Sequence, residues 1–255
     1  MVGTGSSDDV VAVWFGSLAG ETWWEQRADE PLYPASLIKL PVATAAQRRH
    51  DRGEIDLDAT VLVHPDFDSV VPDEHFELVR EDDQDDATWD ALGEQVSLRT
   101  LRERSICVSG NLATDLLLEP VGVEEVAAVL DDAGCSGATA VTHGIGDVAA
   151  RDRGLLNVMT ARDVGRLLTT TPPEVEEVMR GQTYRDGIPA ALPGPTTYAG
   201  KTGWVDDHSH DAAILRGPGV EPCAMVVLTR VAGSTYDERN GLVRAAAAEA
   251  WRRRP

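Results

Sequence analysis

The chain has 255 residues, of which 42% are hydrophobic, and this is enough to bury a sizeable core in one or two domains. Its 23 basic and 43 acidic residues give a formal net charge of −20. This charge excludes a general binder of nucleic acids or anionic membranes, because like charges repel. The sequence has no run of about 18 apolar residues, so no membrane-spanning helix is predicted.

The basic residues are 21 arginines and only two lysines, Lys39 and Lys201. An acidic surface nearly free of lysine predicts a protein of a high-salt organism, since carboxylates hold hydration water and salt screens their mutual repulsion. The alternative is an acidic protein from a GC-rich genome in which arginine has replaced lysine.

Residues 1–10 are rich in glycine, serine and aspartate, and they lack the basic start and apolar centre of a signal peptide. The three cysteines are too few and too scattered for a disulfide framework. Both observations predict a cytoplasmic protein with reduced thiols.

The N-terminal part predicts a hairpin followed by a helix. Residues 10–18 form an apolar run typical of a buried strand, Gly20 marks a turn, and residues 21–25 are the expected partner strand. Residues 36–49 have apolar side chains at helical spacing, with Pro41 in the first turns of the helix, where proline is tolerated.

The middle of the chain, about 50–185, has a predominantly helical pattern of apolar residues. The expected amphipathic helices cover residues 98–107, 111–118, 123–133 and 161–168. Residues 81–90 are densely acidic. They predict a solvated loop rather than a metal site, because the spacing and the turn glycine of a calcium-binding loop are missing.

The C-terminal part returns to strands. Residues 197–205, 211–216 and 223–230 fit three strands separated by glycine and proline turns. Residues 241–254 predict a closing helix with arginines at its C-terminus, where they suit the helix dipole.

These elements predict an α/β (α+β) fold. Both chain ends would share a five-stranded antiparallel sheet flanked by helices, beside an all-helical lobe. The expected domains are residues 1–35 with 186–255 for the sheet, and residues 36–185 for the helices. The cleft between two such layers is a common place for an active site.

The two lysines are the clearest chemical signal. Lys39 follows Ser36 by three residues, so the two side chains lie one helical turn apart on the same face. A serine hydroxyl needs a base to become a good nucleophile, and a buried amine beside a second cation has a lowered pKa. Lys201 is the expected second cation, and arginine cannot be the base because it does not deprotonate. The alternative interpretation is two leftover surface lysines.

Ser109-Gly110-Asn111 directly precedes one of the expected helices. In a turn or extended segment, residues i and i+2 point the same way, so Ser109 could pass a proton while Asn111 holds a substrate amide. Taken alone, this tripeptide is also a common helix start.

Together these residues form three motifs in order: Ser36-x-x-Lys39, Ser109-x-Asn111 and Lys201-Thr202-Gly203. Such a series is typical of class A β-lactamases and penicillin-binding proteins. Over about residues 10–255 the sequence resembles the class A β-lactamase-like serine hydrolases. Because the second motif begins with serine instead of tyrosine, class C enzymes and their esterase relatives are disfavoured.

The resemblance implies catalytic roles for four residues. Ser36 would be the acylated nucleophile and Lys39 its general base. Ser109 would relay a proton to the leaving nitrogen, and Lys201 would tune the electrostatics of the site.

The resemblance also implies a substrate-binding group. Asn111 would bind the substrate side-chain amide, and Thr202, followed by Gly203, would bind the substrate carboxylate. The backbone N–H groups of Ser36 and Trp204 would form the oxyanion hole, which typically contributes about 10²–10³ in rate per donor.

The sequence departs from this family in the loop that should carry a deacylating glutamate. No glutamate occurs between residues 126 and 173, and the candidate loop 141–156 has only Asp147 and Asp152 as carboxylates. Either could replace the glutamate only if the loop lies closer, because aspartate is one methylene shorter. The alternative is a salt bridge to the neighbouring arginines. His210 is a further candidate for the wall of the cleft.

The expected activity is that of a serine hydrolase that forms an acyl-enzyme on Ser36 with a β-lactam or a related amide or ester, with slow deacylation. The alternatives are a non-hydrolytic penicillin-binding or sensor-like protein, and an amidase or esterase acting on another small metabolite. The expected partner is a small molecule, the expected state is a monomer, and neither a metal ion nor an organic cofactor is expected.

Overall fold

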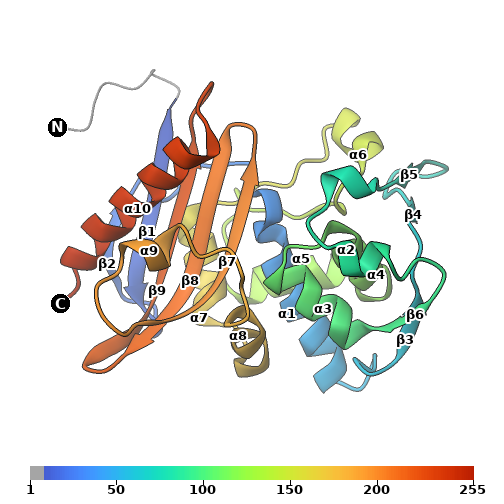
Figure 1. Ribbon diagram of the computed structural model, residues 1–255, viewed down its shortest axis with the longest axis horizontal. Coiled ribbons are helices and arrows are strands. Elements are labelled where there is room, and N and C mark those ends of the chain that lie inside the picture. Colours follow the sequence, from blue (N-terminus) through green and yellow to red (C-terminus); the bar gives the residue numbers. More distant parts are fainter. Residues whose placement is uncertain (1–8) are drawn as a thin grey trace.

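The computed structural model describes residues 9–255 of the chain. Most of the segment 1–10, on which the expectation about a signal peptide rests, lies outside the described residues. The described chain forms a sheet part and a helical part that lie side by side, with the first strand and the C-terminal helix both in the sheet part (Figure 1).

Both ends of the described chain build one antiparallel sheet. Its strands are β1 (Val10–Ser17), β2 (Thr22–Gln26), β7 (Thr197–Val205), β8 (His208–Gly217) and β9 (Val220–Arg230). The strand order is β2-β1-β9-β8-β7, which confirms the predicted five-stranded sheet. The edge strand β7 carries Lys201-Thr202-Gly203, and this edge faces the helical part (Figure 1).

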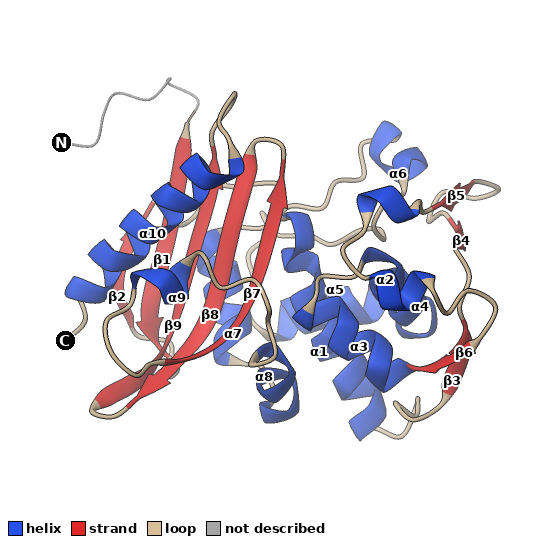
Figure 2. Ribbon diagram, viewed as in Figure 1, coloured by secondary structure: helices blue, strands red, loops and turns tan. Residues whose placement is uncertain are grey.

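Helix α10 (Tyr236–Arg252) covers one face of the sheet (Figure 2). A capping box starts this helix: the Thr235 hydroxyl accepts the Glu238 N–H, and the Glu238 carboxylate accepts the Thr235 N–H. Trp251, near its end, packs against Phe15 of β1 in a buried apolar cluster. The short helix α9 (Ile188–Ala191) packs against α10 in the same layer.

Helix α7 (Ala161–Thr169) packs on the opposite face, against β1 and β9. Its approach is close at Gly165, where an added Cβ would lie 2.3 Å from the Trp14 ring. Helix α7 thus packs on the sheet, although its residues fall within the range 36–185 predicted for the helical domain. The sheet buries the apolar side of α7. An amphipathic pattern shows that one side of a helix is covered, but not whether a sheet or other helices cover it.

The helical part is built around α1 (Lys39–Asp51), which packs against α3 (Leu98–Cys107), α4 (Asn111–Val121) and α5 (Val123–Asp132). Its shorter elements are η1 (Ala35–Ile38), η2 (Arg80–Asp82), α2 (Asp86–Trp89), α6 (Val148–Asp152) and α8 (Pro173–Met179). The helices predicted over 98–107, 111–118 and 123–133 are all present.

The helical part also contains two small antiparallel sheets that the sequence did not predict. One pairs β3 (Thr60–Leu62) with β6 (Gln95–Ser97), and the other pairs β4 (Asp66–Asp68) with β5 (His75–Glu77). Each strand has three residues, which is too short for the alternation of apolar and polar side chains to be recognised.

Within residues 9–255, no helix is both long and apolar enough to cross a bilayer. The three cysteines are unpaired, as the sequence predicts.

Gly165→Ala is expected to lower the free energy of unfolding by about 1–3 kcal/mol, because the new methyl group overlaps the Trp14 ring. Gly241→Ala in α10 is the matched control, since the nearest atom to its added Cβ is 3.8 Å away. This control is expected to gain about 0.5–1 kcal/mol, because alanine loses less backbone entropy on folding. Urea unfolding measures both values, and equal effects would contradict the packing of α7 on Trp14.

Candidate active site

Ser36 lies in the turn that leads from the sheet into the helical part. It is the second residue of η1, and α1 begins at Lys39, one helical turn later. Ala35, directly before Ser36, has a φ of 47°, a left-handed conformation that is uncommon for a residue with a Cβ. Ser36 is half-buried, whereas Lys39 is fully buried. The hydroxyl group is therefore accessible while the amine is removed from bulk water.

The Lys39 amine is surrounded by groups of the second motif. Its Nζ donates to the backbone oxygen of Ser109 at 2.5 Å, to Asn111 Oδ1 at 2.8 Å and to Ser109 Oγ at 3.3 Å. The Asn111 amide is held at its other end, where Nδ2 donates to the backbone oxygen of Asp82 at 2.8 Å. The structure thus brings the first and second motifs together around one buried amine.

Lys201 approaches the same serine from the sheet. Its Nζ donates to Ser109 Oγ at 2.9 Å and to the backbone oxygen of Thr202 at 2.7 Å. Ser109 Oγ therefore lies between two lysine nitrogens that come from distant parts of the chain. The φ of Ser109 is 64°, again left-handed. Such a strained residue persists where its surroundings over-determine it, most often at functional sites.

The two buried amines have lowered pKa values. Burial lowers the pKa of Lys39 to about 7. Burial and the adjacent Lys39 lower the pKa of Lys201 well below its usual value. At Lys39 this effect is opposed by nearby carboxylates, of which Asp83 and Asp115 raise its pKa most. A group with a pKa near 7 is partly neutral at neutral pH, so Lys39 can accept a proton there.

Asp83 belongs to the acidic segment 81–90, and its position corrects the prediction of a solvated loop. Its Oδ1 accepts the Asn111 N–H and its Oδ2 accepts the Leu112 N–H, both at 2.8 Å. Trp89 Nε1 also donates to Asp83, at 2.9 Å. The carboxylate caps the N-terminus of α4, where negative charge suits the helix dipole, and fixes the start of that helix beside Ser109.

Strand β7 lies directly against the turn that carries Ser36. A Cβ on Gly203 would lie 3.0 Å from the Ser36 nitrogen and 3.1 Å from the Pro34 oxygen, so a larger residue would press on this turn. The backbone at Gly203-Trp204 is thereby placed beside the Ser36 amide, as the predicted oxyanion hole requires. The Thr202 hydroxyl is buried and has no hydrogen-bond partner in residues 9–255, so its hydrogen-bonding capacity is unused there.

His210 is a buried structural residue rather than part of the cleft wall. Its Nε2 donates to the Tyr33 carbonyl oxygen at 2.9 Å, and its Nδ1 accepts the Thr229 N–H at 3.2 Å. Burial lowers the pKa of His210 to about 4, which favours the neutral ring that these two bonds require. His210 therefore connects β8 and β9 to the segment that precedes Ser36.

The two aspartates considered for deacylation lie elsewhere. Asp147 is buried, and its carboxylate accepts the Ser69 hydroxyl at 2.8 Å, the Val70 N–H at 3.1 Å and the Ala150 N–H at 2.9 Å. These bonds cap α6 and tie it to the segment after β4. Asp152 is exposed at the end of α6. Asp147 thus has a structural role, which the sequence could not distinguish from a catalytic one.

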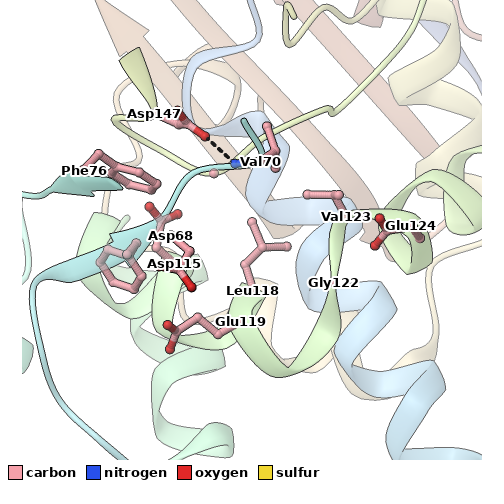
Figure 3. A pocket seen from close by; sticks show the side chains of 12 residues that line it. Asp68, Val70, Phe76, Asp115, Leu118, Glu119, Gly122, Val123, Glu124 and Asp147 are labelled. Atoms are coloured by element: carbon pink, nitrogen blue, oxygen red, sulfur yellow. Dashed lines mark hydrogen bonds between the residues drawn. The ribbon is translucent and has the colours of Figure 1, made fainter. Parts of the chain in front are cut away.

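Asp115 is a buried carboxyl group of α4. Its Oδ1 accepts the Ile145 N–H at 2.9 Å, and burial raises its pKa well above the usual value. Figure 3 shows Asp115, Leu118 and Asp147 around a cavity of about 420 Å³. Ser36 does not line this cavity. The cavity is therefore distinct from the candidate site around Ser36, although Asp115 raises the pKa of Lys39.

Asp83 and Asp115 are the two site residues that sequence reasoning missed. Asp83 lies within an acidic run, where no spacing distinguishes a capping residue from a solvated one. Asp115 follows Asn111 by four residues, and this spacing places both on one face of the predicted helix. The helical spacing of Asn111 and Asp115 could therefore have placed Asp115 near the site from the sequence alone.

Comparison with known proteins agrees with the fold. Residues 2–253 match the beta-lactamase enzyme family. The chain belongs to this family. A search of curated proteins found no match to this beta-lactamase-family chain.

Solved structures share the fold at low sequence identity. PBP-A has a TM-score of 0.76 at 18% identity, with 97% of this chain and 90% of that chain covered. A beta lactamase from Xanthomonas campestris pv. campestris has a TM-score of 0.80 at 21% identity, with 96% and 91% covered. A beta-lactamase from Sphaerobacter thermophilus has a TM-score of 0.76 at 18% identity, with 96% and 90% covered. These likenesses establish the beta-lactamase fold of the chain.

Asp83→Asn is expected to lower the pKa of Lys39 further, because it removes a negative charge that stabilises the ammonium form. Acylation that needs neutral Lys39 rises with pH through about 7 in the wild type, and this rise moves to lower pH in the variant. Asp86→Asn, at an exposed position of the same segment, is expected to leave the midpoint in place.

The pH profile of the acylation rate constant measures these midpoints. An upward shift in Asp83→Asn, or equal shifts in both variants, would show that Asp83 does not set the charge of Lys39.

Proposed function

We propose that this protein is a serine hydrolase that forms a covalent acyl-enzyme on Ser36 with β-lactams or related amides and esters. The observation that carries the proposal is the arrangement of Lys39 and Lys201, both buried and both within hydrogen-bond distance of Ser109 Oγ, with the half-buried Ser36 one helical turn before Lys39. Membership of the beta-lactamase enzyme family supports it.

In the proposed reaction, neutral Lys39 accepts the hydroxyl proton of Ser36 while Ser36 Oγ bonds to the substrate carbonyl carbon. The backbone N–H groups of Ser36 and Trp204 stabilise the negative charge on the carbonyl oxygen. The carbon–nitrogen bond then breaks, and the leaving nitrogen takes the proton of Ser109 Oγ, which protonated Lys39 replaces. Water finally hydrolyses the ester and frees Ser36.

The surroundings of the site favour slow release of the acyl group. In the loop 141–156, Asp147 is occupied by three donors and Asp152 is exposed. Asp115 Oδ1 already accepts the Ile145 N–H. These observations support a second candidate function, a penicillin-binding or sensor-like protein in which the acyl-enzyme persists. PBP-A, one of the similar structures, has been described as an acyl-enzyme complex with penicillin G in a mutant form.

Benzylpenicillin is expected to add one penicillin mass to the wild-type protein and none to Ser36→Ala. The adduct is expected to persist for minutes or longer, because in the loop 141–156 Asp147 is occupied by three donors and Asp152 is exposed. Intact-mass spectrometry over time, in multimolar salt, measures both the adduct and its decay.

An adduct on Ser36→Ala would refute the nucleophile assignment. Decay within seconds with accumulation of product would instead identify an efficient β-lactamase and refute slow release. If the wild type forms no adduct, β-lactams are not its substrates.

Lys39→Arg is expected to slow acylation by about 10²–10⁴-fold although the positive charge is kept, because arginine does not deprotonate. Arg52→Lys at the exposed end of α1 is the control for an exchange between the two cations, and it is expected to acylate at the wild-type rate. Rates of adduct formation compare the three proteins. Acylation by Lys39→Arg at the wild-type rate would rule out Lys39 as the base.

A further inference from the structure

Three aromatic side chains gather next to the Lys201-Thr202-Gly203 strand. Trp204 comes from β7, Tyr184 from the segment after α8, and Tyr236 from the first turn of α10. The Trp204 ring centroid lies 4.7 Å from that of Tyr184 and 5.9 Å from that of Tyr236, both in edge-to-face geometry. Each side chain is half-buried, so each ring still exposes part of its surface. These three residues are called the aromatic wall below.

The aromatic wall borders a hollow of about 590 Å³, which is within the size range of small-molecule sites. The charged residues of the hollow are already engaged. Arg185 Nη2 donates to the Arg180 carbonyl oxygen at 2.9 Å, and Asp186 Oδ2 accepts from Asn240 Nδ2 at 2.8 Å. Gln84 and Thr183 complete the lining, and the three rings favour a flat apolar group.

Strand β7 places this hollow relative to the reaction. Thr202 and Trp204 are two residues apart, so their side chains lie on the same side of the strand. Gly203 between them abuts the Ser36 amide, and the buried Thr202 hydroxyl has no partner within residues 9–255. If Thr202 binds a carboxylate of the substrate, a substituent on the carbon next to that carboxylate would lie against the Trp204 ring.

We infer that the aromatic wall is a subsite for an aromatic group carried beside the carboxylate on the leaving part of the substrate. The preferred substrates are amides or esters whose leaving part combines a carboxylate with an aryl substituent. The orientation of the substrate in this inference rests on the proposed function. Binding of a ligand to the subsite, however, does not require acylation of Ser36.

Equilibrium binding to the Ser36→Ala protein tests the subsite directly. The probes are N-acetylphenylalanine and N-acetylalanine, each as both enantiomers, which share an amide and a carboxylate and differ only in the phenyl ring. The better enantiomer of the phenyl compound is expected to bind about tenfold more tightly than the matching alanine compound. Titration calorimetry or ligand-observed NMR measures the affinities.

Trp204→Leu and Tyr236→Leu in the same background are each expected to reduce this preference to about threefold or less. Trp24→Leu is the matched control, because Trp24 is a half-buried ring on β2 under Arg253, and it is expected to keep the preference. Equal affinities for the two probes, no detectable binding of the phenyl compound, or a preference that survives both substitutions would overturn the inference. Suppose that the phenyl compound still binds more tightly but that penicillin does not acylate the wild-type protein. That result would support the subsite and refute only acylation by β-lactams.

Discussion

The burial of two lysine amines around a single serine hydroxyl is the constraint on which the site depends. Taking a cation out of water costs free energy, and two adjacent cations disfavour each other's charge as well. Ser109 and Asn111 offset part of this cost by accepting hydrogen bonds from Lys39. Asp83 and Asp115 offset a further part through their negative charge. The balance lowers the pKa of Lys39 to about 7, which is the property a base needs at neutral pH.

The fold meets this constraint by joining three distant segments at one edge of the sheet. Lys201 comes from β7, Lys39 from the start of α1, and Ser109 from the turn between α3 and α4. The contact between η1 and β7 is so close that a Cβ on Gly203 would lie 3.0 Å from the Ser36 nitrogen. Both turns that present a serine contain a left-handed non-glycine residue, Ala35 and Ser109. The surrounding packing must therefore hold these turns in place, which keeps the reacting groups preorganised.

The long elements of the fold were predictable because their patterns are strong. The expected helix 98–107 and strand 197–205 coincide with α3 and β7. The three motifs were also readable, since lysine is so rare in this chain that its two positions stand out. Three-residue strands carry too little periodicity to be recognised, and the sheet packing of α7 depends on a contact between Gly165 and Trp14 that no local pattern contains.

The sequence was least informative about which polar side chains already have hydrogen-bond partners within the fold. His210 and Asp147 had been candidates for the cleft and for deacylation, but both have their hydrogen-bonding capacity committed to holding segments of the chain together. Asp83 looked like one of many solvated carboxylates and is instead the cap of α4. Satisfaction of a polar group is a property of its three-dimensional neighbours, so residue type and spacing alone cannot reveal it.

The rarity of lysine allows the central claim to be tested directly. With two lysines in the chain, protein labelled with ¹³C at the lysine ε-carbon gives two lysine resonances, and Lys39→Arg identifies that of Lys39. The account predicts that the Lys39 resonance titrates near pH 7 and that the Lys201 resonance titrates well below its ordinary value. If both resonances titrate near the ordinary lysine pKa of about 10.4, the two amines are not perturbed by burial, and the account is wrong.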